Sequence, residues 1–410
     1  MEIKTEENTY IWNYRIAYSY YYLDNYLKAK KYFSKAIEIN PNEADSHLFL
    51  CWTYQELSNK ENENYEKAIK YINKSLEYLN SYSKLQPKED IKDELIFSEE
   101  RLGWLYNKLK NYVEAEKHLR KGLELGDNDE WTYSQLAYNL RLQNRYDESI
   151  ENYKKAIELG RKDTWIYSEI AWAYFLAEKP RNALEHMNIA RELSPVDVDP
   201  LLVSRTSSIL VALGKHTEAI KILKDIIGKE EFKDNVGMLS DLAYVYNDLE
   251  DYKNALIYLK RANELGRNDL WINREFSFVY YYLGECEKAY KYLIILKDLG
   301  EKDIKLDLMF AYTLSKMGKY EEALEYFLKL LEFDEYKNDV STNYQVAWIY
   351  SEFEKAEEAL KYFFKAEELG RDDRAINIEI GTNLARTGKI LEGIDRLKIA
   401  LTMEEGITSE

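Results

Sequence analysis

The sequence IAYSYYYLDNYLKAKKYFSKAIEINP, residues 16–41, contains two small residues, Ala17 and Ala29, that each begin a series along the chain. The first series is Ala17, Cys51, Gly103, Ala137, Ala171, Ser207, Ala243, Ser277, Ala311, Ala347 and Gly381. The second is Ala29, Ala68, Ala115, Ser149, Ala183, Ala219, Ala255, Ala289, Ala323, Ala359 and Gly393. Most steps in both series are 34 or 36 residues. Because small residues at a fixed offset let two helices approach closely, the sequence predicts eleven copies of an antiparallel helix pair.

Helix start and stop signals recur with the same period. Glu-Leu-Gly or Asp-Leu-Gly closes five predicted helices, at Gly126, Gly160, Gly266, Gly300 and Gly370, where glycine can take the left-handed conformation that ends a helix. A side chain that can accept hydrogen bonds from free amide groups precedes eight predicted helices. These residues are Asp129, Asp163, Asp199, Asn235, Asp269, Asp303, Asp339 and Asp373.

These features resemble the tetratricopeptide repeat (TPR) family over residues 10–403. The segment Leu102-Gly103-Trp104-Leu105-Tyr106 is similar to the family's Leu-Gly-x-x-Tyr element. The first repeat carries the family's residues at Ile16, Ala17, Tyr20, Ala29, Phe33, Ala36 and Pro41. The resemblance implies an all-α fold, a right-handed α-solenoid of about eleven helix-turn-helix repeats whose first helices line a concave groove.

The expected organisation is a polar lead over residues 1–9, one continuous solenoid over 10–403 and a polar tail over 404–410. The repeat phase breaks once, between Cys51 and Gly103, where the chain has 18 residues more than one 34-residue period. The extra residues lie near 58–64 and 80–94. A longer second helix with a surface loop is favoured over a hinge or a lateral contact, because solenoid loops tolerate insertion.

Composition excludes several classes of protein. The 410 residues include only 16 Gly and 5 Pro, too few for a β-sandwich or a glycine-rich α/β enzyme. The net charge of −17 disfavours nucleic acid and anionic membranes as partners. The first residues have no apolar segment typical of a secretory signal, and no apolar run is long enough to span a membrane. With only Cys51 and Cys286, which form no motif, a cytoplasmic location is expected.

Motif searches favour a non-enzymatic protein. The four histidines are scattered, and the sequence contains no HExxH, GxSxG, Walker or GxGxxG motif. No catalytic residue, metal site or cofactor is therefore expected. Cys51 occupies a small-residue core position, whereas Cys286 is expected in a turn, as an exposed thiol.

An aromatic series marks the predicted groove. The residue after each member of the first small series is aromatic in nine of eleven repeats, namely Tyr18, Trp52, Trp104, Tyr138, Trp172, Tyr244, Phe278, Tyr312 and Trp348. Three further indoles, Trp131, Trp165 and Trp271, stand seven residues before such a position and share its helical face. Two interpretations remain open, a ladder of rings that binds a partner and rings that pack repeat against repeat.

Charged residues stand on the same face, among them Arg141, Arg274, Lys108, Lys316, Glu100 and Asp248. Their mixed signs do not favour capture of a peptide carboxylate, and ordinary solvated charge is the alternative. At the N-terminal end, rings crowd where a solenoid normally carries a polar cap. Self-association through Trp12, Tyr14, Tyr21 and Tyr22, as a homodimer, is therefore a hypothesis.

The predicted function is a scaffold or adaptor whose aromatic groove binds a protein or peptide segment. Two alternatives remain. An acidic inhibitor or immunity-type protein could wrap a basic enzyme, with salt-dependent association. A soluble sensor could bind a short peptide or a small ligand and tighten around it.

Overall fold

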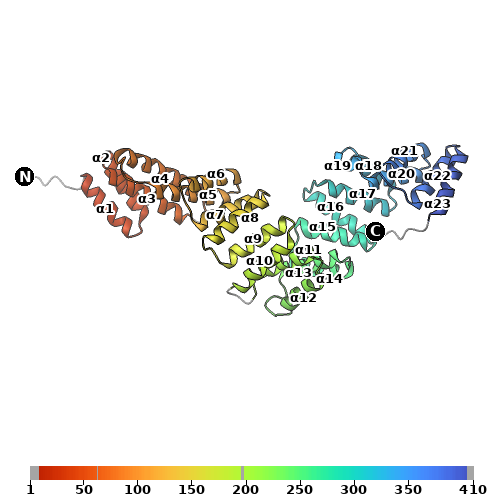
Figure 1. The fold of residues 1–410 in the computed structure, drawn as a ribbon, viewed down its shortest axis with the longest axis horizontal. Coiled ribbons are helices and arrows are strands. Elements are labelled where there is room, and N and C mark those ends of the chain that lie inside the picture. Colours follow the sequence, from red (N-terminus) through yellow and green to blue (C-terminus); the bar gives the residue numbers. More distant parts are fainter. Residues whose placement is uncertain (1–8, 62, 195–197, 404–410) are drawn as a thin grey trace, which may run out of the picture. The chain divides into compact units, whose positions relative to one another are not determined.

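The computed structural model describes residues 9–61, 63–194 and 198–403, and the expected polar tail and all but the last residue of the polar lead lie outside them. The described residues contain 23 helices and no strand (Figure 1). Apart from the four-residue α19, Asp334–Lys337, the helices form eleven consecutive pairs along the sequence. The prediction of an all-α chain of helix-turn-helix repeats is therefore confirmed.

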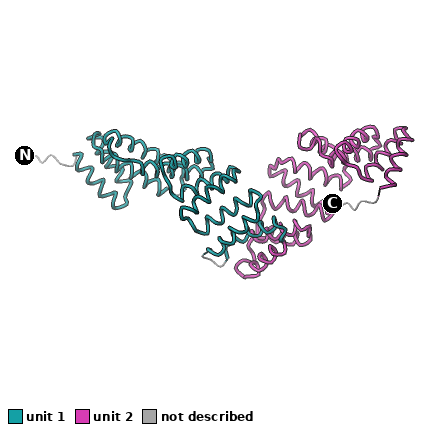
Figure 2. The backbone as a smooth tube through the Cα atoms, viewed as in Figure 1, with its two compact units in different colours: residues 1–215 teal, residues 216–410 magenta. Residues whose placement is uncertain are grey.

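The chain forms two compact units, residues 1–215 and 216–410 (Figure 2). Unit 1 contains eleven helices. They are α1 Tyr10–Tyr22, α2 Tyr26–Ile39, α3 Ala44–Lys60, α4 Tyr65–Leu85, α5 Lys92–Lys108, α6 Tyr112–Glu124, α7 Glu130–Leu142, α8 Tyr146–Glu158, α9 Thr164–Leu176, α10 Pro180–Glu192 and α11 Pro200–Ala212.

Unit 2 contains the remaining helices. They are α12 His216–Ile227, α13 Val236–Asp248, α14 Tyr252–Glu264, α15 Leu270–Tyr282, α16 Cys286–Asp298, α17 Ile304–Lys316, α18 Tyr320–Leu330, α19, α20 Val340–Glu352, α21 Ala356–Glu368, α22 Arg374–Arg386 and α23 Ile390–Thr402. Within each unit a helix packs mainly on its pair partner and on the next pair, except that α11 packs on α10 and α12 on α13, since their pair falls on the unit boundary.

The predicted helix signals act as expected. All eight Asp and Asn residues are N-caps whose side chains accept a hydrogen bond from a backbone amide of the helix that follows. The five predicted closing glycines have φ between 84° and 115°. A second left-handed residue, which the sequence analysis missed, lies in the turn inside most pairs. Glycine occupies several of these turns, but Asp24, Lys110, Asn144, Glu178, Glu250 and Glu354 occupy the others with φ of 55–62°.

Small residues bring the two helices of a pair together, as predicted. In the last pair, a Cβ on Gly393 would lie 2.6 Å from the carbonyl oxygen of Gly381, so the two backbones touch. The second helices add an apolar stripe at helical spacing, such as Ala359, Phe363 and Ala366 in α21, all fully buried. This stripe and the small residues form the core between successive pairs.

Two sequence expectations concern irregular positions. The extra residues near 58–64 and 80–94 lengthen helices, because α4 has 21 residues and α3 and α5 have 17 each, against 13 in most others. The remainder forms the loop between α4 and α5.

The expectation that Cys286 is an exposed thiol is wrong, because Cys286 is the first residue of α16 and only 7% exposed.

Candidate functional site

One hollow of unit 2 lies along its first helices. It has a volume of about 990 Å³ and contains residues of α13, α15, α17 and α20. Three members of the predicted ladder line it, Tyr244, Phe278 and Tyr312. The ladder positions of three successive repeats thus meet at one surface, because residues 34 apart occupy equivalent positions on stacked helices.

This hollow combines apolar and polar groups. Tyr244 is 41% exposed, whereas burial raises the pKa of Tyr312 to about 12. The Nζ atom of Lys316 lies 3.9 Å from the ring centroid of Tyr281. The Oδ2 atom of Asp248 lies 2.7 Å from the Nε2 atom of His216. The surface therefore offers partly exposed aromatic rings beside a basic and an acidic side chain.

Sequence analysis missed part of this lining. Tyr252, Tyr282 and Met309 also face the hollow, and the rings of Tyr252 and Tyr282 stack at 4.8 Å. Tyr282 belongs to a run of three tyrosines that ends α15, and this run was the available signal.

Unit 1 has two smaller hollows that share Trp104. One, of about 320 Å³, contains Trp104 and Trp131 together with Asn59, Phe97, Glu100, Arg101 and Asp129. The other, of about 330 Å³, contains Trp104, Tyr138 and Trp165 together with Asn107, Lys108, Gln135 and Arg161. Four predicted rings therefore line a surface of unit 1.

Other predicted rings pack on neighbouring groups. Trp52 meets Phe49 edge-on at 5.0 Å, and Trp348 meets Tyr320 in the same way at 5.3 Å. Trp172 stacks on Phe175 at 4.7 Å, and Arg267 covers Trp271 at 4.2 Å. Each of these four indoles is still partly exposed. These four rings thus pack on neighbouring side chains, and binding of a partner by the ladder stays a prediction.

The two predicted arginines differ in availability. Arg141 lies in a buried cluster, where it and Arg205 each donate to one oxygen of Glu169 at 2.8 Å. Its side chain is only 10% exposed, so Arg141 holds α7 against α9 and α11. Arg274 is 53% exposed and pairs with Glu301 at 2.6 Å. Of the two, only Arg274 is accessible to a partner.

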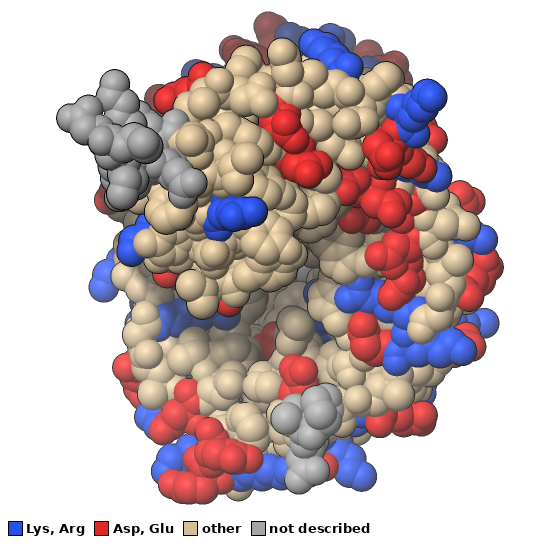
Figure 3. All heavy atoms as spheres, turned by 90° about the vertical axis from the view of Figure 1, so that its left-hand side faces the viewer, with Lys and Arg blue, Asp and Glu red and all other residues tan. Residues whose placement is uncertain are grey.

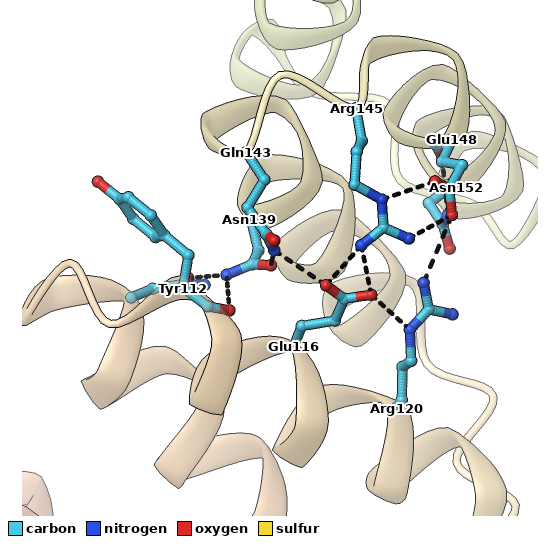
Figure 4. A network of polar contacts seen from close by, with 9 residues as sticks. Tyr112, Glu116, Arg120, Asn139, Gln143, Arg145, Glu148 and Asn152 are labelled. Atoms are coloured by element: carbon cyan, nitrogen blue, oxygen red, sulfur yellow. Dashed lines mark hydrogen bonds and ion pairs between the residues drawn. The ribbon is translucent and has the colours of Figure 1, made fainter.

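A second polar network joins α6 to the turn between α7 and α8 (Figure 4). Glu116 accepts hydrogen bonds from Arg120, Gln143 and Arg145 at 2.7–2.9 Å. Burial disfavours the ionised form of Glu116, but these hydrogen bonds outweigh it and lower its pKa. Because both carboxylate oxygens are engaged, this network joins two repeats and leaves no acceptor for a ligand.

The N-terminal helix exposes part of its aromatic cluster. Trp12 is 42% and Tyr22 63% exposed, whereas Tyr14 and Tyr21 are half-buried against Phe49. Figure 3 views the molecule from the side on which α1 lies in Figure 1, and most of the nearest surface carries no charged side chain. Elsewhere on this face acidic and basic side chains are interspersed. The predicted self-association through this end stays a prediction.

Within the described residues, no group of three or more His, Cys, Asp or Glu side chains could hold a metal ion. In the same residues, no helix combines the length and the apolar character needed to cross a bilayer.

Comparison with known proteins identifies the repeat. Family models described as tetratricopeptide repeat match residues 11–43, 100–128, 236–269 and 308–337, and one described as TPR repeat matches residues 137–177. No curated protein matches the sequence.

Several solved structures with similar folds have low sequence identity to this chain. PilF of Pseudomonas aeruginosa is 15% identical, with 54% of this chain and 99% of that chain covered and a TM-score of 0.43. YrrB, described as a TPR protein with an unusual peptide-binding site, is 19% identical, with 48% and 92% covered and a TM-score of 0.37. The Cut9–Hcn1 hetero-tetramer of APC/C gives 13% identity, 96% of both chains covered and a TM-score of 0.44.

Proposed function

Given that the chain belongs to the tetratricopeptide repeat family, we propose that it is a non-enzymatic scaffold that binds an extended segment of a partner protein in the hollow of unit 2. The observation that carries the proposal is the alignment of Tyr244, Phe278 and Tyr312 along one hollow of about 990 Å³. This volume lies at the upper end of the range of small-molecule pockets.

The geometry of the hollow suits a peptide better than a small metabolite. Its rings come from three successive repeats and are partly exposed, so they offer a series of shallow contacts along the stack. Aromatic rings supply a large contact area with few rotatable bonds, which is why they are frequent at binding hot spots. Asp248 and Lys316 would fix the direction of the segment through its backbone and polar side chains.

The proposal can be tested with a defined probe. A phage library of random dodecapeptides is selected against the full chain, and the enriched peptides are measured by fluorescence anisotropy. Tyr244→Ala and Phe278→Ala should each weaken binding by about tenfold or more. The matched control is Phe364→Ala, which removes a ring of similar exposure, 40% against 41% for Tyr244, from the second helix α21.

The outcomes separate the groove from the rest of the surface. Peptides that lose affinity in the groove variants and keep it in the control support the proposal. Failure to enrich any peptide would refute it, and so would equal losses in all three variants. Circular dichroism of each variant verifies that helicity is unchanged.

A further inference from the structure

One turn of the repeat holds a guanidinium in unit 1. Arg161 stands two residues before the N-cap of α9, and its Nε donates to Asp163 at 3.0 Å. Its Nη1 donates to the hydroxyl of Ser134 in the preceding repeat at 2.5 Å, and its guanidinium lies 4.6 Å from the ring centroid of Trp165. A carboxylate, a second acceptor and an indole face thus enclose one planar cation.

The carboxylate and the indole of this arrangement recur in unit 2. Arg267 donates to Asp269 at 3.0 Å and lies 4.2 Å from the ring centroid of Trp271. In a later repeat Ala375 replaces the indole. Arg371 lies 3.4 Å from the ring centroid of Tyr344, which occupies the position equivalent to Ser134. The guanidinium is therefore retained although its platform changes.

The repeat that begins with α7 departs from this pattern at two positions. It has the indole, Trp131, and the N-cap carboxylate, Asp129. Glu100 stands 34 residues before Ser134 and therefore occupies the equivalent position. Its carboxylate is a stronger hydrogen-bond acceptor than the serine hydroxyl. At the place of Arg161, however, this repeat has Asp127. The groups that surround a guanidinium are present, and the guanidinium is replaced by a carboxylate.

In the described residues no cation lies over the ring of Trp131, although Arg101 lines the same hollow. Burial raises the pKa of Glu100 to about 7, against the hydrogen bond donated by Thr132; a side-chain hydrogen bond with Asp127 and the charges of Asp127 and Asp129 raise it further. Apart from this contact with Glu100, the buried Oδ2 atom of Asp127 has no hydrogen-bond partner among the described residues. An incoming cation would reduce the electrostatic repulsion among these carboxylates, since a nearby opposite charge favours their ionised form.

Basic residues of the chain itself do not fill the place on Trp131. Arg101 lines the hollow, but it lies over Trp104 at 4.6 Å and donates to the carbonyl oxygen of Ser58 at 2.8 Å. Lys92 lies beside Gly126, outside the lining of the hollow. Within the described residues no ring and no cation stacks on Trp131, in contrast to Trp165 and Trp271.

We propose that the hollow formed by Trp104, Trp131, Glu100 and Asp129 receives an arginine side chain of a partner protein, in the place that Arg161 and Arg267 occupy in their own repeats. The indole of Trp131 would stack on the guanidinium, and the two carboxylates would accept its N–H groups. The hollow of about 320 Å³ is large enough for one such side chain. The proposal rests on the proposed function in one respect, that the arginine belongs to a polypeptide.

The test uses the full chain labelled with 5-fluorotryptophan, in which eight indoles give separate fluorine signals. The Trp131 signal is assigned from the spectrum of Trp131→Phe. The probe is N-acetyl-arginine amide, and its neutral isostere N-acetyl-citrulline amide is the control ligand. We expect the Trp131 signal to shift with the arginine probe, with a dissociation constant on the order of 1–10 mM, and at least about tenfold more weakly with the citrulline probe.

Two exchanged variants sharpen the test. Asp127→Arg supplies the missing guanidinium from within the chain, so the Trp131 signal should move without probe and then stop responding to it. Arg161→Asp removes the covering guanidinium from Trp165, so a second indole should begin to respond. A Trp131 signal that ignores the arginine probe, or responds equally to citrulline, would overturn the proposal, as would an unchanged response in Asp127→Arg.

The same experiments separate this proposal from the proposed function. If selected dodecapeptides bind unit 2 while the arginine probe leaves Trp131 unchanged, the groove stands and the arginine site fails. If the probe shifts Trp131 and no peptide is enriched, the arginine site stands and groove binding fails.

Discussion

Replacing Glu100 with glutamine should stabilise unit 1 in a pH-dependent way. The pKa of Glu100 rises from 4.5 to about 7 in the folded chain, mainly through burial. At about 1.4 kcal/mol per pKa unit this difference corresponds to about 3 kcal/mol, and partial exposure reduces the expected value to about 2 kcal/mol. Glutamine still accepts the hydrogen bond from Thr132 and carries no charge.

The sign follows from proton binding. Between pH 4.5 and about 7 the folded chain holds a proton on Glu100 that the unfolded chain has released. The stability of the wild type therefore falls as the pH rises through this window, and the penalty is complete above it. The advantage of Glu100→Gln should be near zero below pH 4.5, grow across the window and remain constant at higher pH.

Hydrogen–deuterium exchange measures this effect locally, which matters because a stack of repeats need not unfold in one step. Peptides from α5 and α7 are compared between wild type and variant at pH 4, 5.5, 7 and 8.5, so that the intrinsic exchange rate cancels. The control Glu124→Gln changes an exposed residue of the same repeat. A difference that does not vary with pH would refute the reasoning, and so would lower protection of the variant at pH 8.5.

Three further predictions concern packing, turns and thiols. Gly393→Ala should destabilise the last repeat by about 1–3 kcal/mol in urea unfolding, because its Cβ would lie 2.6 Å from the backbone of Gly381. Gly122→Ala should be neutral or stabilising by up to about 1 kcal/mol, because the closest contact of its Cβ would be 3.9 Å. The opposite order of the two effects would contradict the packing. Glu250→Gly should stabilise unit 2 by up to about 1 kcal/mol in the same assay, since φ at this turn is 59°, and a loss of stability would show that its side chain has another role. Cys51 should resist Ellman's reagent until the chain unfolds, because burial raises its pKa to about 12, and rapid reaction in buffer without denaturant would show that the core opens.

Local signals made most of the fold predictable from the sequence. The N-caps, such as Asp163, and the closing glycines, such as Gly160, act within a few residues, so their effect does not depend on tertiary context. Small residues such as Gly393 are informative because close backbone contact excludes a larger side chain. The left-handed turn residues were harder to predict, because glutamate at Glu250 carries no sign of a positive φ.

The candidate site was less predictable, because availability depends on contacts between repeats. Arg141 and Arg274 are both arginines on first helices, yet Glu169 buries one and the other is half exposed. The difference arises from Glu169, whose two oxygens also receive Arg205 from a later repeat. A single ladder position could not show which arginine would find such a partner.

Departures from the repeat carry more information about binding than the repeated features do. Residues 34 apart share a backbone environment, so one repeat serves as the control for the next. Arg371 keeps its guanidinium although the ring beneath it is now Tyr344, so the cation at this turn does not depend on one kind of aromatic ring. Asp127 removes the cation while Trp131 and Glu100 remain, so the acceptors are preserved without their donor. If Asp127 only weakened the turn, there would be no reason for Glu100 to replace serine at the position that faces it. Together the two differences exchange a basic group for acidic ones beside Trp131.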